Sequence, residues 1–365
     1  MASPLQEIRR NPLFWLLAFV PAVFVAERLA PASHTLHFVL SVFAIVPLAA
    51  LLSHATEAVA AKTGDAVGGL LNATLGNVTE LVIALAALRA GQYLLVKASI
   101  AGVIVTNSLF MLGAAFLLGG LKHRVQEYNR AGARLQASLL FLATFALLVP
   151  SAMAGADRMP AEGFTTTLSV GIAVLLIITY GLGAYFSLGT HRGFFSGAEH
   201  APEEGETHWP MGLALGMLAG ATVLVALVAE VFIVSVEAAA ASFGMTPAFV
   251  GFIVVPLVGG AAEMVSAFAA ARKDRLDLAV GIALGSSSQI ALFIAPLLVL
   301  LSLAVGPSPM DLQFWPGAVV MIMIATLSAT LVTNSGRSAW FVGVLLLMVY
   351  LIFGLTLYLL PPAVG

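Results

Sequence analysis

Charge is scarce in this chain and cysteine is absent. Only 16 Lys and Arg and 18 Asp and Glu occur among 365 residues, so that 9% are charged while 60% are hydrophobic. A soluble domain carries roughly 25% charged and 45–50% apolar residues. Without cysteine there are no thiol catalysts, thiolate metal sites or disulfide frameworks, and a net charge of -2 with no basic block argues against nucleic-acid binding. High hydrophobicity also excludes a disordered chain, which leaves a polytopic membrane protein.

Apolar runs long enough to cross a bilayer recur along the chain. A helical span needs about 20 mostly apolar residues to cross ~30 Å of hydrocarbon, whereas a β-barrel would show alternating segments of about 10 residues. The sequence therefore predicts an all-α polytopic membrane protein with about 11 transmembrane helices. They are expected at about residues 12–30, 36–55, 67–88, 93–119, 135–153, 164–188, 210–232, 246–270, 277–303, 314–332 and 339–360.

The distribution of Lys and Arg predicts the orientation, because cytoplasmic loops carry an excess of these residues. With a cytosolic N-terminus, twelve of them fall in the cytosol and only Arg28, Arg89, Lys97 and Arg158 fall outside. The first run is interpreted as an uncleaved span, since its apolar part continues past the candidate cleavage region of a signal peptide. We expect a multi-pass protein of a prokaryotic cytoplasmic (inner) membrane, with its N-terminus in the cytosol and its C-terminus outside.

The longest polar stretch, residues 189–209, divides the chain into two parts. It carries three His and four Glu and falls on the cytosolic side. These side chains could hold a regulatory divalent cation. Gly and Pro are interspersed and no ligand spacing repeats, which favours a solvated acidic linker.

The segments on either side of this linker repeat one pattern. Glu57 and Glu237 each precede a glycine by seven residues, Gly76 and Gly259 precede Glu80 and Glu263 by four, and Thr106-Asn107 corresponds to Ser288-Gln289. A five-span unit is odd-numbered, so two consecutive copies insert with opposite orientation. Such inverted repeats are typical of secondary transporters, whose ion site lies near the midplane.

The predicted layout therefore has four parts. An extra N-terminal transmembrane helix covers residues 1–34, and a first five-helix repeat covers 35–188, with its central motif at about 68–118. The cytosolic acidic linker follows at 189–209, and a second repeat covers 210–365, with its motif at about 246–303.

Acidic residues within apolar spans are the candidate ion ligands. One acid at a helix centre costs roughly 2.5–3.5 kcal/mol on insertion scales. Nearly all Lys and Arg fall in loops, so protons or a bound cation must neutralise Glu80, Glu237 and Glu263, the three acids expected to lie deepest. Gly76 and Gly259 lie one helical turn before two of these acids, where a glycine lets the helix unwind and expose a carbonyl ligand.

Oxygen ligands dominate the predicted site. Carboxylates, backbone carbonyls and amide or hydroxyl oxygens form a cage suited to a hard cation such as Ca²⁺, which takes 6–8 oxygen ligands. The members are Glu80, Glu263, Gly76, Gly259, Asn77, Thr106, Asn107, Ser286 and Gln289. Without the cation, two carboxylates close together in a low dielectric tend to take up protons. Competition between cation and protons for the same charges gives obligatory exchange.

The motifs that carry these residues resemble the two α-repeats of the calcium/cation antiporter superfamily, in its Ca²⁺/H⁺ exchanger branch. The motifs are Leu71-Asn-Ala-Thr followed by Gly76-Asn-Val-Thr-Glu80-Leu, and Glu263 through Gly285-Ser-Ser-Ser-Gln289-Ile. The resemblance covers about residues 45–300. It implies that Glu80 and Glu263 bind Ca²⁺ together with the carbonyls of Gly76 and Gly259, and that Asn107 and Gln289 hold ion-bound water. It also implies a role in gating or proton transfer for Glu57 and Glu237.

Two positions depart from the family pattern. Gly260 stands where the family usually has Asn, and Val103 stands where it usually has Ser. Losing one amide and one hydroxyl affects ion selectivity and affinity rather than the transport class. Mn²⁺, or a monovalent cation such as Na⁺ or K⁺, is therefore an alternative substrate for proton antiport.

Simpler interpretations remain open for Glu57 and Glu230. Glu57 could lie at the cytosolic membrane edge and pair with Lys62, because edge acids cost little. Glu230 lies seven residues before Glu237 and could share its face, either as a helix-packing hydrogen bond or as a proton relay.

An intramembrane enzyme and a passive channel are the competing classes. Every Asp falls in a predicted loop, no His lies in the second repeat, and His-Glu-x-x-His is absent, so the common protease sites are not available. A channel is disfavoured because the inverted repeat indicates alternating access. The expected partners are Ca²⁺ or a related cation, protons and the lipid bilayer, with no resident cofactor and no nucleic acid; a homo-oligomer is compatible with the pattern.

Overall fold

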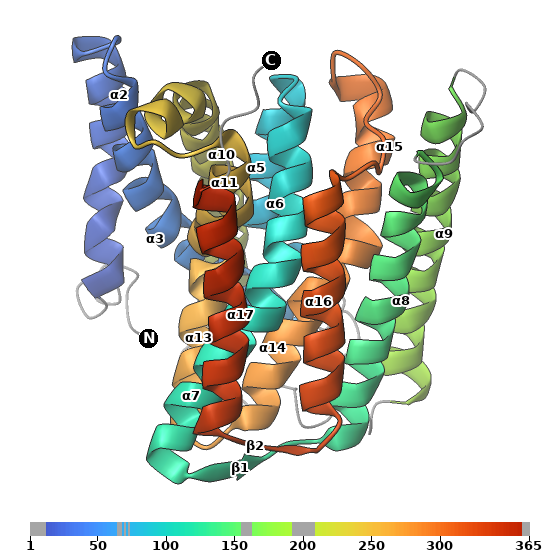
Figure 1. Cartoon of the computed structure of the whole chain (residues 1–365). Helices are drawn as coiled ribbons and strands as arrows, with labels where there is room; N and C mark the ends of the chain where they lie inside the picture. Colours follow the sequence, from blue (N-terminus) through green and yellow to red (C-terminus); the bar gives the residue numbers. More distant parts are fainter. Residues whose placement is uncertain are drawn as a thin grey trace.

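The computed structural model describes residues 12–63, 68, 71, 74–154, 163–191 and 209–359, and this part forms a single bundle of long helices (Figure 1). Its α-helices are α2 (Phe19–Leu29), α3 (His34–Ala60), α5 (Val78–Arg89), α6 (Tyr93–Val105), α7 (Leu112–His123), α8 (Arg130–Ala154), α9 (Phe164–Tyr185), α10 (Met211–Ser242), α11 (Pro247–Phe249), α12 (Val255–Gly259), α13 (Ala261–Arg272), α14 (Leu276–Gln289), α15 (Ala295–Val305), α16 (Pro316–Thr333) and α17 (Trp340–Leu359). The 3₁₀-helix η1 (Pro12–Ala18) begins the described chain.

Within the described residues, eight helices are long and apolar enough to cross a membrane, or up to nine if a bent pair is counted as one span. This confirms an all-helical membrane protein and leaves the count of 11 a prediction. Two of the eleven predicted spans are not among these eight or nine helices. The run at 12–30 is divided between η1 and α2, and the run at 67–88 lies partly outside the described residues, as does most of the linker 189–209.

Burial separates central helices from peripheral ones. The helix Tyr93–His123, which joins α6 and α7, is buried over 83% of its most apolar stretch, whereas Phe164–Leu188 is buried over only 17%. Both are strongly apolar. An apolar helix with an exposed surface suits contact with lipid, while an apolar helix covered on all sides forms the core. The segment from α6 to α7 therefore lies at the centre of the bundle.

Breaks in the helical hydrogen-bond pattern gather near the centre. The pair Pro247–Gly259 and Ala261–Arg272 is bent by 60° at Gly260. Pro256 lies one turn before the bend, and a proline is a common cause of a helix kink. Three π-helical turns, η2 (Thr106–Met111), η5 (Val250–Val254) and η6 (Ile290–Ile294), interrupt central helices. Such π turns leave backbone groups less regularly bonded and are frequent at functional sites.

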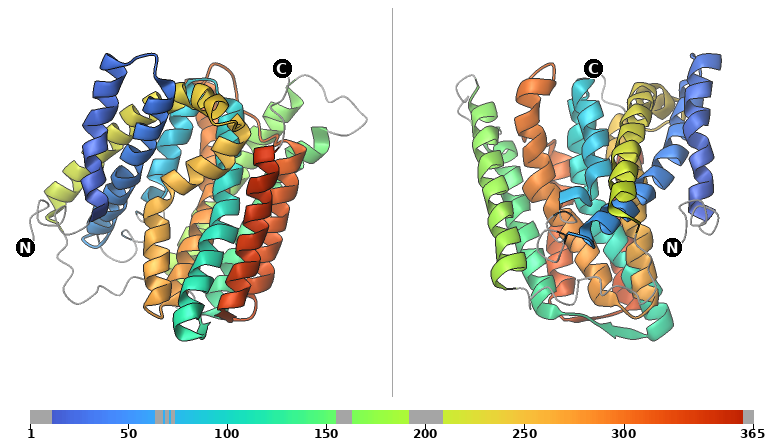
Figure 2. Two further views of the ribbon diagram at one scale, coloured as in Figure 1. Left: turned by 60° about the vertical axis from the view of Figure 1, so that its left-hand side comes forward. Right: turned by 180° about the vertical axis from the view of Figure 1, so that it is seen from behind.

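Helices from the two parts of the chain are interleaved. Helix α3 packs along α10, as both views in Figure 2 show, and α8 packs along α16. Helix α7 contacts α13 and α17, while α15 contacts α5 and α9. A short antiparallel pair, β1 (Val125–Glu127) with β2 (Arg337–Ala339), joins the two parts at the lower edge in Figure 1. The central breaks are thus enclosed by helices from both halves.

Candidate ion-binding site

Two helix starts bring the predicted acids into the centre of the bundle. Helix α5 begins after Asn77 and α13 begins after Gly260, and Glu80 and Glu263 each occupy the first turn. Acids are favoured in the first helical turn because the unpaired N–H groups and the helix dipole are positive there. The two acids thus have the same local setting in the two halves of the chain.

The carboxyl group of Glu80 lies over the bend of the other half. Glu80 is only 7% exposed. A Cβ added at Gly259 would lie 3.5 Å from its Oε1, and one added at Gly260 would lie 3.6 Å from the same oxygen. The two glycines therefore provide room for this carboxylate and put it beside the backbone at the break.

A chain of hydrogen bonds links the halves beside Glu80. The Asn77 amide donates to Gln289 Oε1 at 2.8 Å, and the Ser286 hydroxyl donates to Asn77 Oδ1 at 2.6 Å. Asn107 Nδ2 in turn donates to Ser286 Oγ at 2.9 Å. All four side chains are buried. Asn77 is placed by the start of α5 and Asn107 by η2, while Ser286 and Gln289 come from the last turn of α14.

Glu263 completes the group. It interacts electrostatically with Glu80 and with Ser286, and its Oε2 is buried with no hydrogen-bond partner. Gln289 Nε2 is also buried and unpartnered. Neither acid has a Lys or Arg partner among the described residues. Since a buried charge without a partner is costly, this arrangement calls for a positive group that binds both carboxylates or for protonation.

Among the predicted ligands, seven are brought together: Glu80, Glu263, Gly259, Asn77, Asn107, Ser286 and Gln289. Gly76 lies in the turn before α5, and Thr106 has a different partner. Its hydroxyl lies 3.2 Å from the Tyr350 hydroxyl of α17, so it bonds away from the Asn77 group. Sequence reasoning missed Tyr350, and it also missed the contact between Ser108 and Ser287, whose hydroxyl oxygens are 3.4 Å apart. Nothing in the local sequence identifies these partners, because each pair is far apart along the chain.

The three outer acids do not join this group. Glu237 is exposed in the second-last turn of α10, so it does not share the burial of Glu80, and its expected depth in the membrane stays a prediction. Glu230 is exposed as well and forms an ion pair with Arg89 of α5 at 3.5 Å; its expected role in helix packing or as a proton relay stays a prediction. Glu57 is half-buried and accepts a hydrogen bond from Ser53 at 3.3 Å.

No group of three or more His, Cys, Asp or Glu side chains within the described residues could hold a metal ion. The Glu80 and Glu263 site therefore has two acids and otherwise neutral oxygens.

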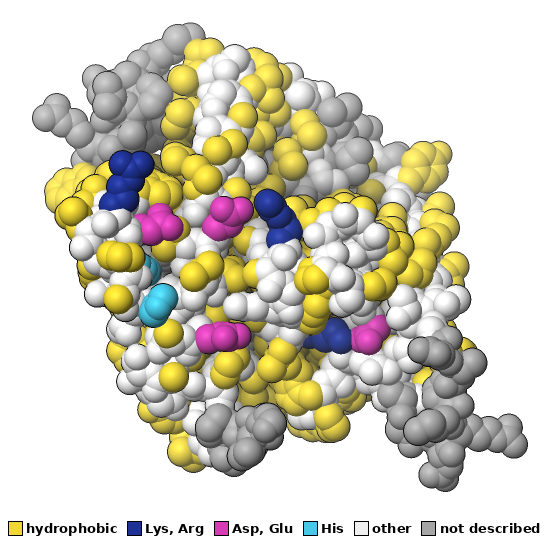
Figure 3. Space-filling view, turned by 90° about the horizontal axis from the view of Figure 1, so that it is seen from above, with side chains coloured by type: hydrophobic (Ala, Val, Ile, Leu, Met, Phe, Trp, Pro, Cys, Tyr) yellow, Lys and Arg dark blue, Asp and Glu magenta, His cyan; other side chains and the backbone are white. Residues whose placement is uncertain are grey.

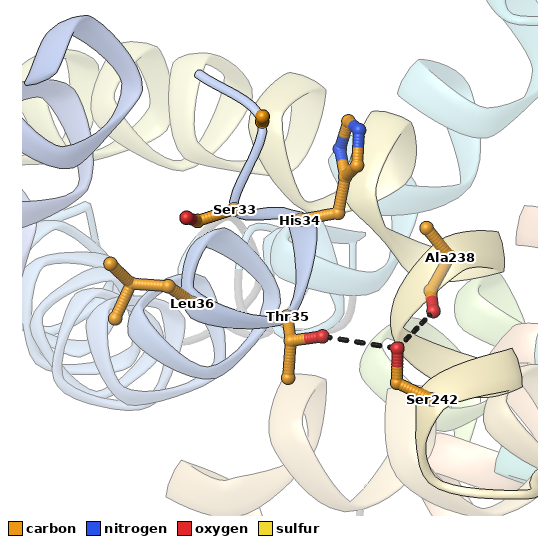
Figure 4. Close-up of a pocket in the computed structure, with 7 residues that line it drawn as sticks. Ser33, His34, Thr35, Leu36, Ala238 and Ser242 are labelled. Atoms are coloured by element: carbon orange, nitrogen blue, oxygen red, sulfur yellow. Dashed lines mark hydrogen bonds between the residues drawn. The ribbon is translucent and has the colours of Figure 1, made fainter. Parts of the chain in front are cut away.

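A pocket of about 410 Å³ lies elsewhere, between the start of α3 and the end of α10. It is lined by His34, Thr35 and Ser242, and Thr35 donates to Ser242 Oγ at 3.3 Å (Figure 4).

Comparison with known proteins decides the family. The sequence matches the sodium/calcium exchanger protein family over residues 33–189 and again over 213–359. The chain belongs to this family. Among curated exchangers, it is 39% identical to a Ca²⁺/H⁺ antiporter of Synechocystis over 96% of this chain and 97% of the relative. It is 37% identical to the Ca²⁺/H⁺ antiporter ChaA of Bacillus subtilis over 96% of this chain and 100% of the relative.

Solved exchangers share the fold. The structure of native YfkE superposes with a TM-score of 0.82 at 34% identity, covering 95% of this chain and 100% of YfkE. The H⁺/Ca²⁺ exchanger CAX superposes with a TM-score of 0.73 at 16% identity, covering 96% of this chain and 88% of CAX. The family and the fold therefore agree over nearly the full length of the chain.

Proposed function

We propose that this protein is a secondary antiporter that exchanges cytosolic Ca²⁺, or a similar divalent cation, for protons by alternating access. The observation that carries the proposal is the burial of Glu80 from one half of the chain beside Glu263 from the other, with no Lys or Arg partner among the described residues. The relatives named Ca²⁺/H⁺ antiporters support it at 37–39% identity over nearly the full length.

Charge balance explains how exchange would be obligatory. Two carboxylates neutralise one divalent cation, and the cation is the transported substrate rather than a resident cofactor. Protons neutralise the same two groups when the cation leaves. An unneutralised pair would resist passage through a closed, dry intermediate, because a desolvated charge is expensive. Only the cation-loaded and the protonated site would therefore change between inward-facing and outward-facing forms.

The ligand set that we propose combines these acids with neutral oxygens. Backbone carbonyls would come from Gly76, in the turn before α5, and Gly259, at the end of α12. Amide and hydroxyl oxygens would come from the cluster around Asn77 and Ser286. Ca²⁺ takes 6–8 oxygens, so water would supply the remaining positions. Thr106 acts at most through Tyr350 in this arrangement.

Two inverted five-helix repeats would produce the alternating access. The family matches separately in residues 33–189 and 213–359, and this supports a duplicated unit. The contacts support it as well, since α7 with α13 and α17 mirrors α15 with α5 and α9. The four-part layout, with an extra helix at 1–34, repeats at 35–188 and 210–365 and a linker at 189–209, is part of this proposal.

The orientation that we propose puts the β1–β2 end of the bundle in the cytosol of a prokaryotic cell. Basic residues cluster in the loops at that end: Lys122, Arg124, Arg130, Arg272, Lys273, Arg275 and Arg337. Seen from the opposite end, the Lys and Arg side chains lie singly and beside acids (Figure 3). An excess of positive charge on one side is typical of the cytosolic face. The N-terminus would then be cytosolic and the C-terminus outside.

The outer acids are assigned supporting roles. Glu57, held by Ser53 near the end of α3, is the candidate for gating or proton transfer at the cytosolic side. Glu237 and Glu230 lie toward the opposite end of α10 and are candidates at the outer mouth, where Glu230 would first have to leave Arg89.

The test is uptake of radiolabelled Ca²⁺ into everted vesicles, driven by a pH gradient. The parent should accumulate Ca²⁺, whereas Glu80→Gln and Glu263→Gln should each abolish accumulation. The exposed Glu27→Gln, at the end of α2, is a matched control that should leave transport intact. Normal transport by either site variant would refute the proposed site. Competition by Mn²⁺, Na⁺ or K⁺ in the same assay would distinguish the alternative ions.

The competing classes give different results in this assay. A passive channel would carry Ca²⁺ without a pH gradient, and collapsing the gradient would leave its flux unchanged. An enzyme would show no coupled flux. The sodium/calcium exchanger family favours a secondary transporter that needs no cofactor.

A further inference from the structure

Buried polar atoms without hydrogen-bond partners gather at the start of α3, the end that the proposed orientation puts outside. Within the described residues, His34 Nδ1, His37 Nε2 and Ser41 Oγ are each buried and have no such partner. His37 is only 5% exposed, and Ser41 is fully buried. A buried polar atom left unpaired costs about 1–3 kcal/mol, so three of them along two turns of one helix need an explanation. None of them belongs to the ion site.

The three side chains lie on one face of α3. Spacings of three and four residues put positions 34, 37 and 41 on the same side of a helix. That side also carries Phe38, whose ring stacks on Phe232 of α10 with a centroid distance of 5.3 Å. The two imidazole rings are neighbours, with their centroids 6.3 Å apart and their planes at 90°. The histidines and Ser41 therefore lie on the side of α3 that packs against α10.

A pocket leads to this face from outside. The pocket of about 410 Å³ between α3 and α10 has His34 on its wall (Figure 4), and it has room for several water molecules of about 30 Å³ each. In the opposite direction the face becomes apolar at Ile45 and Leu48, which are fully buried. The polar side chains thus run from the pocket through His37 to Ser41, and the series ends there.

No charged side chain fixes the protonation state of the two histidines. Among the described residues, neither forms an ion pair or a side-chain hydrogen bond with the titratable groups of α3 or of the helices packed against it. These groups are His54 and Glu57 on α3, Glu27 and Arg28 on α2, Glu80 and Arg89 on α5, Glu230 and Glu237 on α10, and Glu263 and Arg272 on α13. Each imidazole can therefore gain and lose a proton.

We propose that His34 and His37 form the proton-uptake path at the outer mouth of the exchanger. The inference rests on the proposed antiport and deepens it, because antiport needs a route by which protons enter from outside. Histidine changes charge between pH 5 and 8, and its two ring nitrogens let a proton enter on one and leave from the other.

The transfer has two steps. A hydronium ion in the pocket gives a proton to the lone pair of a His34 ring nitrogen and becomes water. The His34 imidazolium then gives a proton to the lone pair of a His37 ring nitrogen and becomes neutral again. Ser41 is the next polar group on this face, and α3 also contacts α5, α12 and α13, the helices that carry the ion site. A proton that reaches Ser41 is thus on a helix packed against that site.

Two fluxes through the same protein separate proton uptake from cation binding. In everted vesicles the outer mouth faces the lumen, so uptake of radiolabelled Ca²⁺ driven by a pH gradient needs proton binding there. Exchange of radiolabelled Ca²⁺ for unlabelled Ca²⁺ in the lumen, with the gradient collapsed, needs no proton. Both fluxes are measured for the parent, His34→Gln, His37→Gln and the double variant. His123→Gln, at the other end of the bundle, is the matched control, since glutamine can keep the contact with Arg272 O.

His34→Gln and His37→Gln should each lower the maximal rate of gradient-driven uptake by about tenfold or more. A positioned proton-transfer group contributes roughly 10²–10⁴-fold, and water in the pocket retains part of the transfer. The KM for Ca²⁺ and the rate of Ca²⁺–Ca²⁺ exchange should match those of the parent, and His123→Gln should match the parent in all three.

Unchanged gradient-driven uptake by either histidine variant would overturn the inference. An equal loss of both fluxes would also overturn it, because that result indicates a packing role. If His37→Gln folds poorly, His34→Gln decides alone, since His34 is half-buried at the wall of the pocket. Absence of gradient-driven Ca²⁺ uptake in the parent itself would instead refute the proposed function.

Discussion

Replacing Ser286 with alanine tests whether the hydrogen bonds between the halves hold the site together. The hydroxyl donates to Asn77 Oδ1 at 2.6 Å and accepts from Asn107 Nδ2 at 2.9 Å. Its removal breaks both bonds. It also leaves a buried amide oxygen and a buried amide N–H with one partner fewer, and no water from bulk solvent can replace the hydroxyl without entering the core.

The magnitude follows from two bonds. A hydrogen bond contributes about 0.5–1.5 kcal/mol net in folded proteins, and interhelical bonds in membranes average about 0.6 kcal/mol with a maximum near 1.7. The lower membrane values apply because the unfolded chain also finds polar partners in the bilayer. Asn77 keeps its bond to Gln289, which limits the loss. We expect Ser286→Ala to reduce the free energy of unfolding by about 1–2 kcal/mol.

Equilibrium unfolding in mixed micelles of dodecyl sulfate and dodecyl maltoside measures this free energy. Ser99→Ala is the matched control: Ser99 is buried too, but its hydroxyl donates to Val96 O within the same helix at 2.8 Å. Its loss should cost less than about 0.5 kcal/mol, since the carbonyl keeps its helical bond. A cycle with Asn77→Ala should give a coupling energy of about 0.5–1.5 kcal/mol. If Ser286→Ala were as stable as Ser99→Ala, the hydrogen bonds of Ser286 to Asn77 and Asn107 would contribute nothing to stability.

Three further changes test other parts of the structure. Gly343→Ala would put a Cβ 2.4 Å from Gly113 O and 2.5 Å from Leu117 N, so it should lower the free energy of unfolding by at least about 2 kcal/mol and reduce the yield of monodisperse protein. Gly171→Ala is the control and should change neither, because no atom lies within 4 Å of the added Cβ. Lys97→Met removes the cation that lies 2.5 Å from Asp311 in a partly buried setting, and should lower the free energy of thermal unfolding by about 1–2 kcal/mol. Adding Asp311→Asn should recover more than half of this stability, and no recovery would exclude the ion pair as the cause. Burial raises the pKa of Tyr128, so the folded state keeps the phenol proton at a pH where the unfolded chain begins to lose that proton. The stability that this group contributes is fully present below about pH 10 and falls as the pH rises further, and Tyr128→Phe should flatten this fall in unfolding curves recorded from pH 9 to 11.

The central acids could be predicted from the sequence because of their cost. An acid in an apolar run demands a partner, and the glycine four residues earlier marks the chain break in both halves. The structure has a bend at Gly260, the residue after Gly259, and brings Glu80 against it. Local spacing and hydrophobicity are enough for this prediction, and a single sequence displays both directly.

The exposure of Glu237 could not be predicted in the same way. Helix α10 continues for five residues beyond Glu237 to Ser242, through Ala238, Ala239, Ala240 and Ala241. Alanine is apolar enough to extend a hydropathy run, yet it also suits an exposed helix end. Hydropathy therefore puts the acid in a span, and α10 is a candidate span, but hydropathy does not show that the side chain is exposed.

The contacts between halves depend on geometry that no local pattern encodes. Asn77 and Ser286 are 209 residues apart, and Thr106 and Tyr350 are 244 apart. The π turns η2 and η6 occur at Thr106 and directly after Gln289, and each turn shifts the helix register relative to an uninterrupted α-helix. A helical projection from the sequence would therefore assign the residues that follow each turn to the wrong angle. Thr106 itself contacts the Tyr350 hydroxyl at 3.2 Å, a contact that its spacing did not suggest.

The asymmetry between the halves is where the sequence and the structure inform each other most. Gly260 and Val103 look like two separate losses of polar groups when the chain is read alone. Asn77 lies three residues before Glu80 as Gly260 does before Glu263, and Ser286 lies 23 residues after Glu263 as Val103 does after Glu80. In the structure Asn77 and Ser286 are hydrogen-bonded to each other. Losing one partner alone would leave a buried polar atom unpaired at a cost of about 1–3 kcal/mol, whereas losing both leaves none. The two departures are therefore one coupled change, which leaves neither a donor nor an acceptor unpaired between these two positions.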